Sequence, residues 1–170
     1  MIELLILYEL SKKTLTMYGI SKEINSEFSV LTTPSYGTIK PALKRLEKTI
    51  CVRTQKTMSA GGRPSTFYSI TEKGYEYLSS LLLASPLENP IQFLPSARVK
   101  LACAEVLKGD DKIKMFKTLK VKSESIIIDI NNILQMKDLD FYHKMVFDNL
   151  ICEYKNFTSL LEGFERASKN

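Results

Sequence analysis

Within residues 35–71 the spacing of apolar residues changes from that of a helix to that of a β-strand. This change constrains the fold more than any other feature of the chain. The first part places four apolar residues at the spacing of one buried helix face: Ile39, Ala42, Leu43 and Leu46. Two segments that alternate apolar and polar residues follow, Ile50–Thr57 and Ser65–Ile70. Between them lies Gly61-Gly62, which permits positive φ. The sequence therefore predicts a helix followed by a β-hairpin.

Positive charge is concentrated in the same region. Between Ser35 and Lys73, eight basic residues less two acidic ones give +6, in a chain whose net charge is +5. Lys40, Lys44 and Lys48 recur every four residues, opposite the apolar face of the predicted helix. Cations on a helix and a hairpin neutralise phosphates and release counterions, so this pattern predicts an interface for double-stranded DNA.

Three further helices are predicted around this region. The first covers Ile2–Leu10, and the second begins at Thr16, whose hydroxyl can cap it. The buried side of the second helix is predicted to be Tyr18, Ile20, Ile24 and Phe28. The third of these helices follows the hairpin, where Thr71 can cap it, and it is predicted to bury Tyr75, Leu78 and Leu82. The order helix, helix, helix, hairpin, helix is that of a winged helix-turn-helix.

A change in composition after residue 84 indicates a domain boundary. Residues 85–96 contain Pro86, Pro90 and Pro95, so we expect a linker without helix there. Residues 1–84 would then form a DNA-binding domain and residues 97–170 an all-helical domain. In the second domain helices are predicted over 97–107, from Asp110 or Asp111 to Met136, and over 139–167. The expected fold class is mainly α, or α+β, with a small β-hairpin wing.

The last predicted helix carries apolar residues at alternating spacings of three and four. They are Phe147, Leu150, Tyr154, Phe157, Leu161 and Phe164. Such a seam is typical of helices that pair, and we expect it to join two copies of the chain. The alternative is that the seam packs only within its own chain.

Several function classes lack their signatures. There is no Gly-rich phosphate loop, no HExxH and no nucleophile elbow, so neither an enzyme, a metal site nor a cofactor is predicted. The cysteines are three and widely separated, which favours a reducing compartment over disulfides. Cys103 and Cys152 lie in apolar stretches and are expected to pack there, while Cys51 near Arg53 is a weak candidate for a redox sensor. Without a signal peptide or membrane span, we expect a cytoplasmic protein.

Short motifs in the first 84 residues resemble the PadR-type transcriptional regulators. They are Leu-Ile-Leu-Tyr-Glu-Leu at 5–10, Tyr18-Gly19-Ile20, Gly37-Thr38-Ile39 followed by Pro41-Ala42-Leu43-Lys44-Arg45-Leu46-Glu47, and Tyr68-Ser69-Ile70-Thr71-Glu72-Lys73-Gly74. The resemblance covers about half of the chain, and the length and helical tail are similar to the longer members of that bacterial family. It implies a homodimeric regulator, usually a repressor, that binds a two-fold operator. Two positions depart from the family pattern: Lys40 replaces a tyrosine, and Lys48-Thr49 replaces Glu-Gly.

The predicted recognition helix is 35–48, which would enter the major groove with its N-terminal residues nearest the bases. The predicted DNA-binding residues are Thr33, Ser35, Tyr36, Thr38, Lys40, Lys44 and Arg63. Lys44 is expected on phosphate, and Arg63 at the wing tip in an adjacent minor groove, unless that loop meets only bulk phosphate. A dimer would set two half-sites about 34–36 Å apart.

Two other functions remain open from the sequence. One is a winged helix that binds protein partners, which a weak salt dependence of DNA binding would indicate. The other is an architectural DNA binder, which similar affinity for any DNA sequence would indicate. A small aromatic or hydrophobic effector is a further possible partner. Tyr142, Tyr154 and the phenylalanines of the tail are candidates to line its cavity, although core packing is the stronger interpretation.

Overall fold

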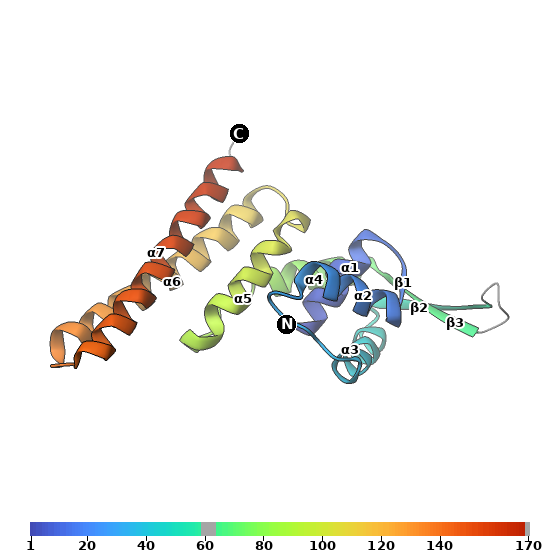
Figure 1. Cartoon of the computed structure of the whole chain (residues 1–170). Helices are drawn as coiled ribbons and strands as arrows, with labels where there is room; N and C mark the ends of the chain where they lie inside the picture. Colours follow the sequence, from blue (N-terminus) through green and yellow to red (C-terminus); the bar gives the residue numbers. More distant parts are fainter. Residues whose placement is uncertain (59–63, 169–170) are drawn as a thin grey trace. The chain divides into compact units, whose positions relative to one another are not determined.

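The computed structural model describes residues 1–58 and 64–168 of the 170-residue chain (Figure 1). It is mainly helical with one small antiparallel sheet, which confirms the predicted winged helix followed by a helical part. In order, the described elements are α1 (Ile2–Lys12), β1 (Leu15–Thr16), α2 (Met17–Phe28), α3 (Tyr36–Lys48), β2 (Val52–Met58), β3 (Pro64–Ile70), α4 (Glu72–Leu83), α5 (Pro90–Ala102), a 3-10 turn (Ala104–Val106), α6 (Asp110–Met136) and α7 (Phe141–Ala167).

The chain divides into two compact units. The first comprises Met1–Ala84 together with Arg98–Val106, and the second comprises Ser85–Ala97 together with the residues from Leu107 onward. In the first unit, α1 is the central helix, and every residue from Leu4 to Leu10 is buried. A helix that is covered on all sides needs apolar residues on all sides, which explains the continuous apolar run from Leu4 to Tyr8.

Two threonines cap helices of the first unit, as predicted. The hydroxyl of Thr16 accepts a hydrogen bond from the Gly19 N–H at 3.1 Å, and that of Thr71 accepts one from the Gly74 N–H at 3.0 Å. Two predictions of burial beside these caps are wrong. Tyr18 is 68% exposed and Tyr75 is 44% exposed, whereas the nearest buried residues of α2 and α4 are Ile20 and Gly74.

The sheet has the strand order β1-β3-β2, and both pairings are antiparallel. The hairpin register runs from Val52 opposite Ile70 to Met58 opposite Pro64, which confirms the two predicted strands. The two residues of β1 add a third strand along β3. Such a short strand has no sequence period of its own, so the prediction missed it.

The C-terminal end of α3 turns sharply into β2. The Ile50 N–H donates to the Glu47 carbonyl and the Cys51 N–H donates to the Leu46 carbonyl, which is the hydrogen-bond pattern of a Schellman motif. This motif requires a left-handed residue at its turn, and Ile50 has φ of 61°. The turn into the hairpin therefore forms with isoleucine at a position that glycine usually occupies.

The prediction that three prolines exclude a helix after residue 84 is wrong. Helix α5 begins at Pro90, where a helix needs no backbone N–H, and it continues through Pro95. The helix predicted over 97–107 accordingly ends earlier, at Ala102, and the 3-10 turn Ala104–Val106 follows it.

The second unit contains the two longest helices, α6 and α7, which lie side by side (Figure 1). Gly109, with φ of 51°, precedes α6 at the cap position, so neither Asp110 nor Asp111 caps it as predicted. Asp140 caps α7 by accepting from the N–H groups of Tyr142 and His143 at 2.8 and 3.1 Å. Within residues 1–58 and 64–168, no helix combines the length and the apolar character that crossing a membrane requires.

Candidate nucleic-acid interface

Helix α3 separates a buried apolar side from an exposed basic side. Ile39, Ala42, Leu43 and Leu46 are buried, as the spacing predicted. Lys40, Lys44 and Lys48 are all exposed. Among the described residues, none of the three lysines has an ion-pair or hydrogen-bond partner. They therefore present three unpaired positive charges to solvent along one helix, where they can neutralise phosphates.

The N-terminal end of α3 exposes small polar groups. The side chains of Thr33, Ser35, Tyr36 and Thr38 are all exposed. Ser35 occupies the cap position, but its hydroxyl lies 3.2 Å from that of Thr38 instead of on a backbone N–H. Side-chain hydroxyls at the N-terminal end of a recognition helix are the groups that usually reach base edges.

Arg45 is exposed like the three lysines of α3, but unlike them it has an ion-pair partner. Its Nε donates to Glu3 Oε1 at 2.7 Å, which ties α3 to α1 and neutralises the charge. The sequence could not reveal this pairing, because the two residues lie 42 positions apart.

The wing adds further cations beside α3. Arg53 and Lys56 are exposed on β2, opposite Ser69 and Thr66 of β3. The Thr54 hydroxyl donates to Glu47 Oε1 at 2.7 Å, so the first part of the wing is hydrogen-bonded to α3. Arg63, the residue predicted to enter a minor groove, lies outside the described residues.

Half of the seam predicted to join two chains is buried within one chain. Tyr154, Phe157 and Leu161 are buried. The ring of Phe93 on α5 stacks on Tyr154 and meets Phe157 edge-on, with centroids 6.2 and 6.0 Å apart. The remaining members are more accessible: Phe147 and Leu150 are half-buried, and Phe164 is exposed but stacks on Phe116 of α6. Tyr154 and Phe157 thus pack in the core of their own unit, whereas Tyr142, the other tyrosine considered for an effector cavity, is 79% exposed.

A different group of apolar side chains is exposed where α6 ends and α7 begins. We call it the hairpin-end cluster, and its members are Ile128, Ile133, Met136, Phe141, Tyr142, Met145 and Val146. A seam at spacings of three and four, from Phe147 to Phe164, does not reveal this cluster. Its signal in the sequence is a separate set of apolar residues that precedes the seam, from Ile128 to Val146.

The cysteines and acidic residues offer little chemistry of their own. Cys51 and Cys103 are buried, whereas Cys152 is exposed, so the expectation that Cys152 packs in a core is wrong. Burial raises the pKa of the Cys103 thiol well above its usual range.

Glu9, Glu23 and Glu27 bring carboxylate oxygens within 4.8 Å of one another. The Lys12 ammonium already provides a countercharge there, 2.6 Å from Glu27 and 3.5 Å from Glu9. The arrangement is therefore an internal ion cluster.

The family match lies within the first unit. Residues 6–80 match the sequence model of the "Transcriptional regulator PadR-like family". No curated protein is similar enough to match. Among solved structures, a PadR family transcription regulator from hypervirulent Clostridium difficile R20291 is 31% identical over 45% of this chain and 78% of that chain, with a TM-score of 0.39.

Two structures of Bacillus subtilis PadR match over nearly the whole length. The one in complex with operator DNA is 19% identical, covers 98% of each chain and has a TM-score of 0.46. The one in complex with p-coumaric acid is 18% identical, covers 99% of this chain and 95% of that chain, and has a TM-score of 0.43.

Proposed function

Because the chain belongs to the PadR-like family of transcriptional regulators, we propose that it binds double-stranded DNA as a homodimer and represses transcription. Helix α3 enters the major groove, with Ser35, Tyr36, Thr38 and Lys40 toward the bases and Lys44 on phosphate. The observation that carries this proposal is the row of three exposed, unpaired lysines on α3. Repression follows if the bound protein covers promoter DNA that the polymerase needs.

The wing supports the same assignment. Arg53 and Lys56 are exposed on a strand whose position beside α3 is set by the Thr54–Glu47 hydrogen bond. Basic groups on two adjoining elements can contact phosphates on both sides of a groove, which fixes the register of the helix on the duplex. We propose that Arg63 adds a minor-groove contact at the tip of this wing.

The hairpin-end cluster supports association of two chains. Its seven large apolar side chains are all exposed in the single chain, and their burial in an interface would release water. We propose that this cluster forms the centre of a homodimer interface, with Phe147, Leu150 and Phe164 at its margin. Two copies of α3 would then contact half-sites about 34–36 Å apart on a two-fold operator, in the cytoplasm.

A charge-removal experiment tests DNA binding. The protein first selects its operator from random DNA, and affinity for that operator is then measured at several salt concentrations. We expect Lys40→Ala with Lys44→Ala to weaken binding at least about tenfold and to lower the salt slope by about 2. Lys114→Ala with Lys117→Ala removes the same charge from exposed positions on α6 and serves as the matched control.

Three results would contradict the proposal. Equal losses in both double variants would show that net charge, not α3, governs affinity. Equal affinity for the operator and for scrambled DNA would indicate an architectural binder. DNA binding with almost no salt dependence would favour a winged helix that serves protein partners.

A further inference from the structure

The exposed face of α3 combines two residues that weaken a helix with a lysine that has no partner. Gly37 and Pro41 lie one turn apart, and Lys40 lies beside them; all three are exposed. Glycine is a poorer helix former than alanine, and a proline in a helix interior removes a backbone hydrogen bond. The presence of both residues on one exposed face therefore needs a physical reason.

Nothing within the described part of the chain requires glycine at Gly37. Its φ does not lie in the left-handed region that favours glycine. A Cβ atom at Gly37 would lie 3.5 Å from the hydroxyl oxygen of Ser35, which is an ordinary van der Waals distance, and would meet nothing nearer. Alanine would fit there and would favour the helix. The glycine instead keeps the surface of α3 open to a group from outside the chain.

Pro41 keeps the surface low one turn later. It has no N–H, so the carbonyl of Gly37 lacks the donor that a helix usually supplies four residues further on. Its short ring projects less than a long side chain would. Together Gly37 and Pro41 allow the backbone of α3 to come close to the floor of a major groove.

Lys40 is the lysine nearest to this low surface. A helix rises about 1.5 Å per residue, so Lys44 and Lys48 lie about 6 and 12 Å further along α3. The major groove of B-DNA is about 8.5 Å deep, and the N-terminal end of a recognition helix lies nearest to the base edges. A helix inserted in this way brings the Lys40 ammonium to the bases and leaves Lys48 at the level of the phosphates.

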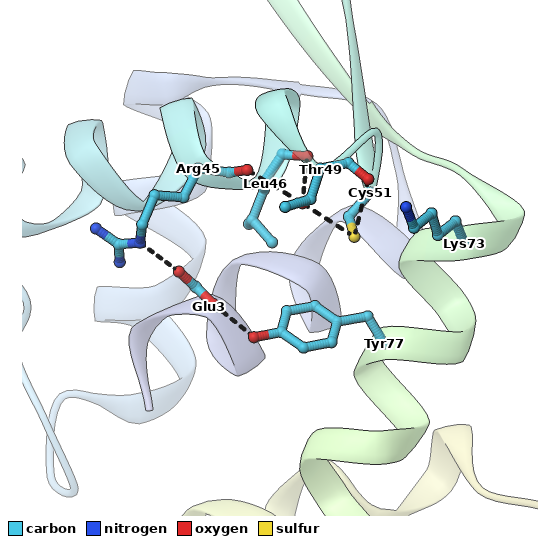
Figure 2. Close-up of a pocket in the computed structure, with 7 residues that line it drawn as sticks. All are labelled: Glu3, Arg45, Leu46, Thr49, Cys51, Lys73 and Tyr77. Atoms are coloured by element: carbon cyan, nitrogen blue, oxygen red, sulfur yellow. Dashed lines mark hydrogen bonds and ion pairs between the residues drawn. The ribbon is translucent and has the colours of Figure 1, made fainter.

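Other polar groups of α3 have partners within the chain. The Nε of Arg45 donates to Glu3 Oε1 at 2.7 Å, which directs it toward α1 (Figure 2). The hydroxyls of Ser35 and Thr38 lie 3.2 Å apart, so one of them donates to the other. The exposed Lys40 ammonium has no hydrogen-bond or ion-pair partner among the described residues. All three of its N–H donors are therefore free to meet a base.

The chemistry of an ammonium group decides which base it selects. Lysine only donates hydrogen bonds, so it recognises acceptors. In the major groove guanine presents two acceptors side by side, O6 and N7. Adenine presents one acceptor beside an amino group, thymine one beside a methyl group, and cytosine only an amino group. A lysine that reaches the base edges therefore favours guanine.

We propose that Lys40 selects a guanine at one position of each half-site of the operator, and that Gly37 and Pro41 permit the close approach that this contact needs. This assignment rests on the proposed function, because it presupposes that α3 enters the major groove. It gives Lys40 and Lys44 different roles. Lys40 determines which base is bound, whereas Lys44 contacts phosphate and adds affinity for any sequence.

Selection from random DNA tests the base preference. The parent chain, Lys40→Met and Lys44→Met each select bound sequences from the same pool. We expect a guanine at symmetric positions of the two half-sites with the parent chain and with Lys44→Met, and no base preference at those positions with Lys40→Met. Lys44→Met should weaken binding to all sequences by a similar factor.

Base analogues locate the contact on the guanine. Replacing that guanine by 7-deazaguanine in both half-sites removes the N7 acceptor from the major groove and keeps the base pair. Inosine removes only the amino group in the minor groove and is the matched control. We expect 7-deazaguanine to weaken binding of the parent chain at least about fivefold and binding of Lys40→Met less than about twofold. Inosine should change neither affinity more than about twofold.

Gly37→Ala separates close approach to DNA from folding. The added methyl group fits within the chain and favours the helix, so the variant should be at least as stable in urea as the parent chain. We nevertheless expect operator affinity to fall at least about fivefold, the loss of one good base contact, because the methyl group holds α3 away from the bases. Gly163→Ala in α7, where a Cβ would meet nothing within 4 Å, should leave operator affinity unchanged.

Three results would overturn the role of Lys40: an operator without guanine at symmetric positions, a Lys40→Met variant that keeps the guanine preference, or equal affinity for 7-deazaguanine and guanine. A Gly37→Ala variant with full operator affinity would overturn the close approach. Each of these results leaves the proposed function intact if binding is still sequence-specific. A parent chain that binds no DNA, or binds every sequence alike, would instead overturn the proposed function and this assignment with it.

Discussion

Gly74 lies directly against the carbonyl oxygen of Cys51. A Cβ atom at Gly74 would lie 2.2 Å from that oxygen and 2.6 Å from Cγ1 of Ile70. The same carbonyl accepts a hydrogen bond from the Thr71 N–H at 3.1 Å, so it cannot move aside without losing that bond. The contact brings the first turn of α4 close to the residue that precedes β2. It therefore helps to hold the wing against the helices of the first unit.

We expect Gly74→Ala to lower the free energy of unfolding by about 2–3 kcal/mol, because backbone and not a flexible side chain must move to admit the methyl group. Urea unfolding followed by circular dichroism measures the change. The control is Gly163→Ala in α7, where a Cβ would meet nothing within 4 Å. That change should raise stability by about 0.5–1 kcal/mol, because alanine favours a helix more than glycine does. A neutral Gly74→Ala variant would show that the two segments are not in contact.

Ile50 is a position where a substitution to glycine should raise stability. Its φ of 61° is costly for a β-branched side chain, and 62% of that side chain is exposed, so burial compensates little. We expect Ile50→Gly to raise the free energy of unfolding by about 1 kcal/mol, the steric relief less the added flexibility of the unfolded chain. Thermal unfolding checks this. Val30→Gly, at a site that is 91% exposed and has no positive φ, should instead be destabilising. A loss of stability in both variants would rule out backbone strain at Ile50.

Local signals in the sequence predicted local structure well. Thr16 and Thr71 each cap a helix through their own hydroxyl, and the physical cause acts within three residues. The sequence also predicted the buried side of α3 and the two wing strands. Each of these segments is long enough for its apolar residues to repeat at a recognisable spacing. The exposure of Tyr18 and Tyr75 was not predicted. The spacing of apolar residues locates the buried face of a helix only to within about one residue.

Features that depend on distant residues could not be predicted. The pairing of Arg45 with Glu3 removes one apparent DNA-binding cation, and only the packing of α3 on α1 reveals it. The α7 seam indicates a partner helix, but a sequence does not say whether that partner belongs to the same chain. Here α5 and α6 cover much of it. The DNA contacts assigned to Ser35, Tyr36 and their neighbours stay predictions.

Glu9 makes stability depend on pH. The residue is completely buried, and neither carboxylate oxygen has a hydrogen-bond partner among the described residues. Burial raises the pKa of Glu9 from 4.5 to about 7, against the opposing charge of Lys12. The folded state thus holds this proton more tightly than the unfolded state. Its contribution to stability is fully present below about pH 4.5 and is lost as the pH rises through about 7.

We therefore expect the free energy of unfolding of the parent protein to fall by about 2–3 kcal/mol between pH 5 and pH 8 because of Glu9, and Glu9→Gln to abolish this fall. The variant should be more stable than the parent at pH 8 and similar to it near pH 4.5. Free energies of unfolding from urea titrations across this range provide the measurement. Glu76→Gln, at an exposed position on α4, should leave the slope unchanged. The role of Glu9 would be contradicted if the free energy of unfolding of the parent protein stayed constant or rose from pH 5 to 8, where the other carboxylates are already ionised.

The hairpin-end cluster predicts how association responds to charge. Met145 and Val146 are exposed in the single chain, so replacing them removes little intrachain packing. We expect Met145→Lys with Val146→Lys to weaken the dimer at least about tenfold, because two charges would be buried or brought together across the two-fold axis. Sedimentation equilibrium at micromolar concentration measures the mass, and circular dichroism checks that the helices persist. Asn156→Lys, further along α7 and outside the cluster, is the control. A parent chain that is monomeric at these concentrations, or a double variant that dimerises as well as the control, would show that this surface does not join two copies.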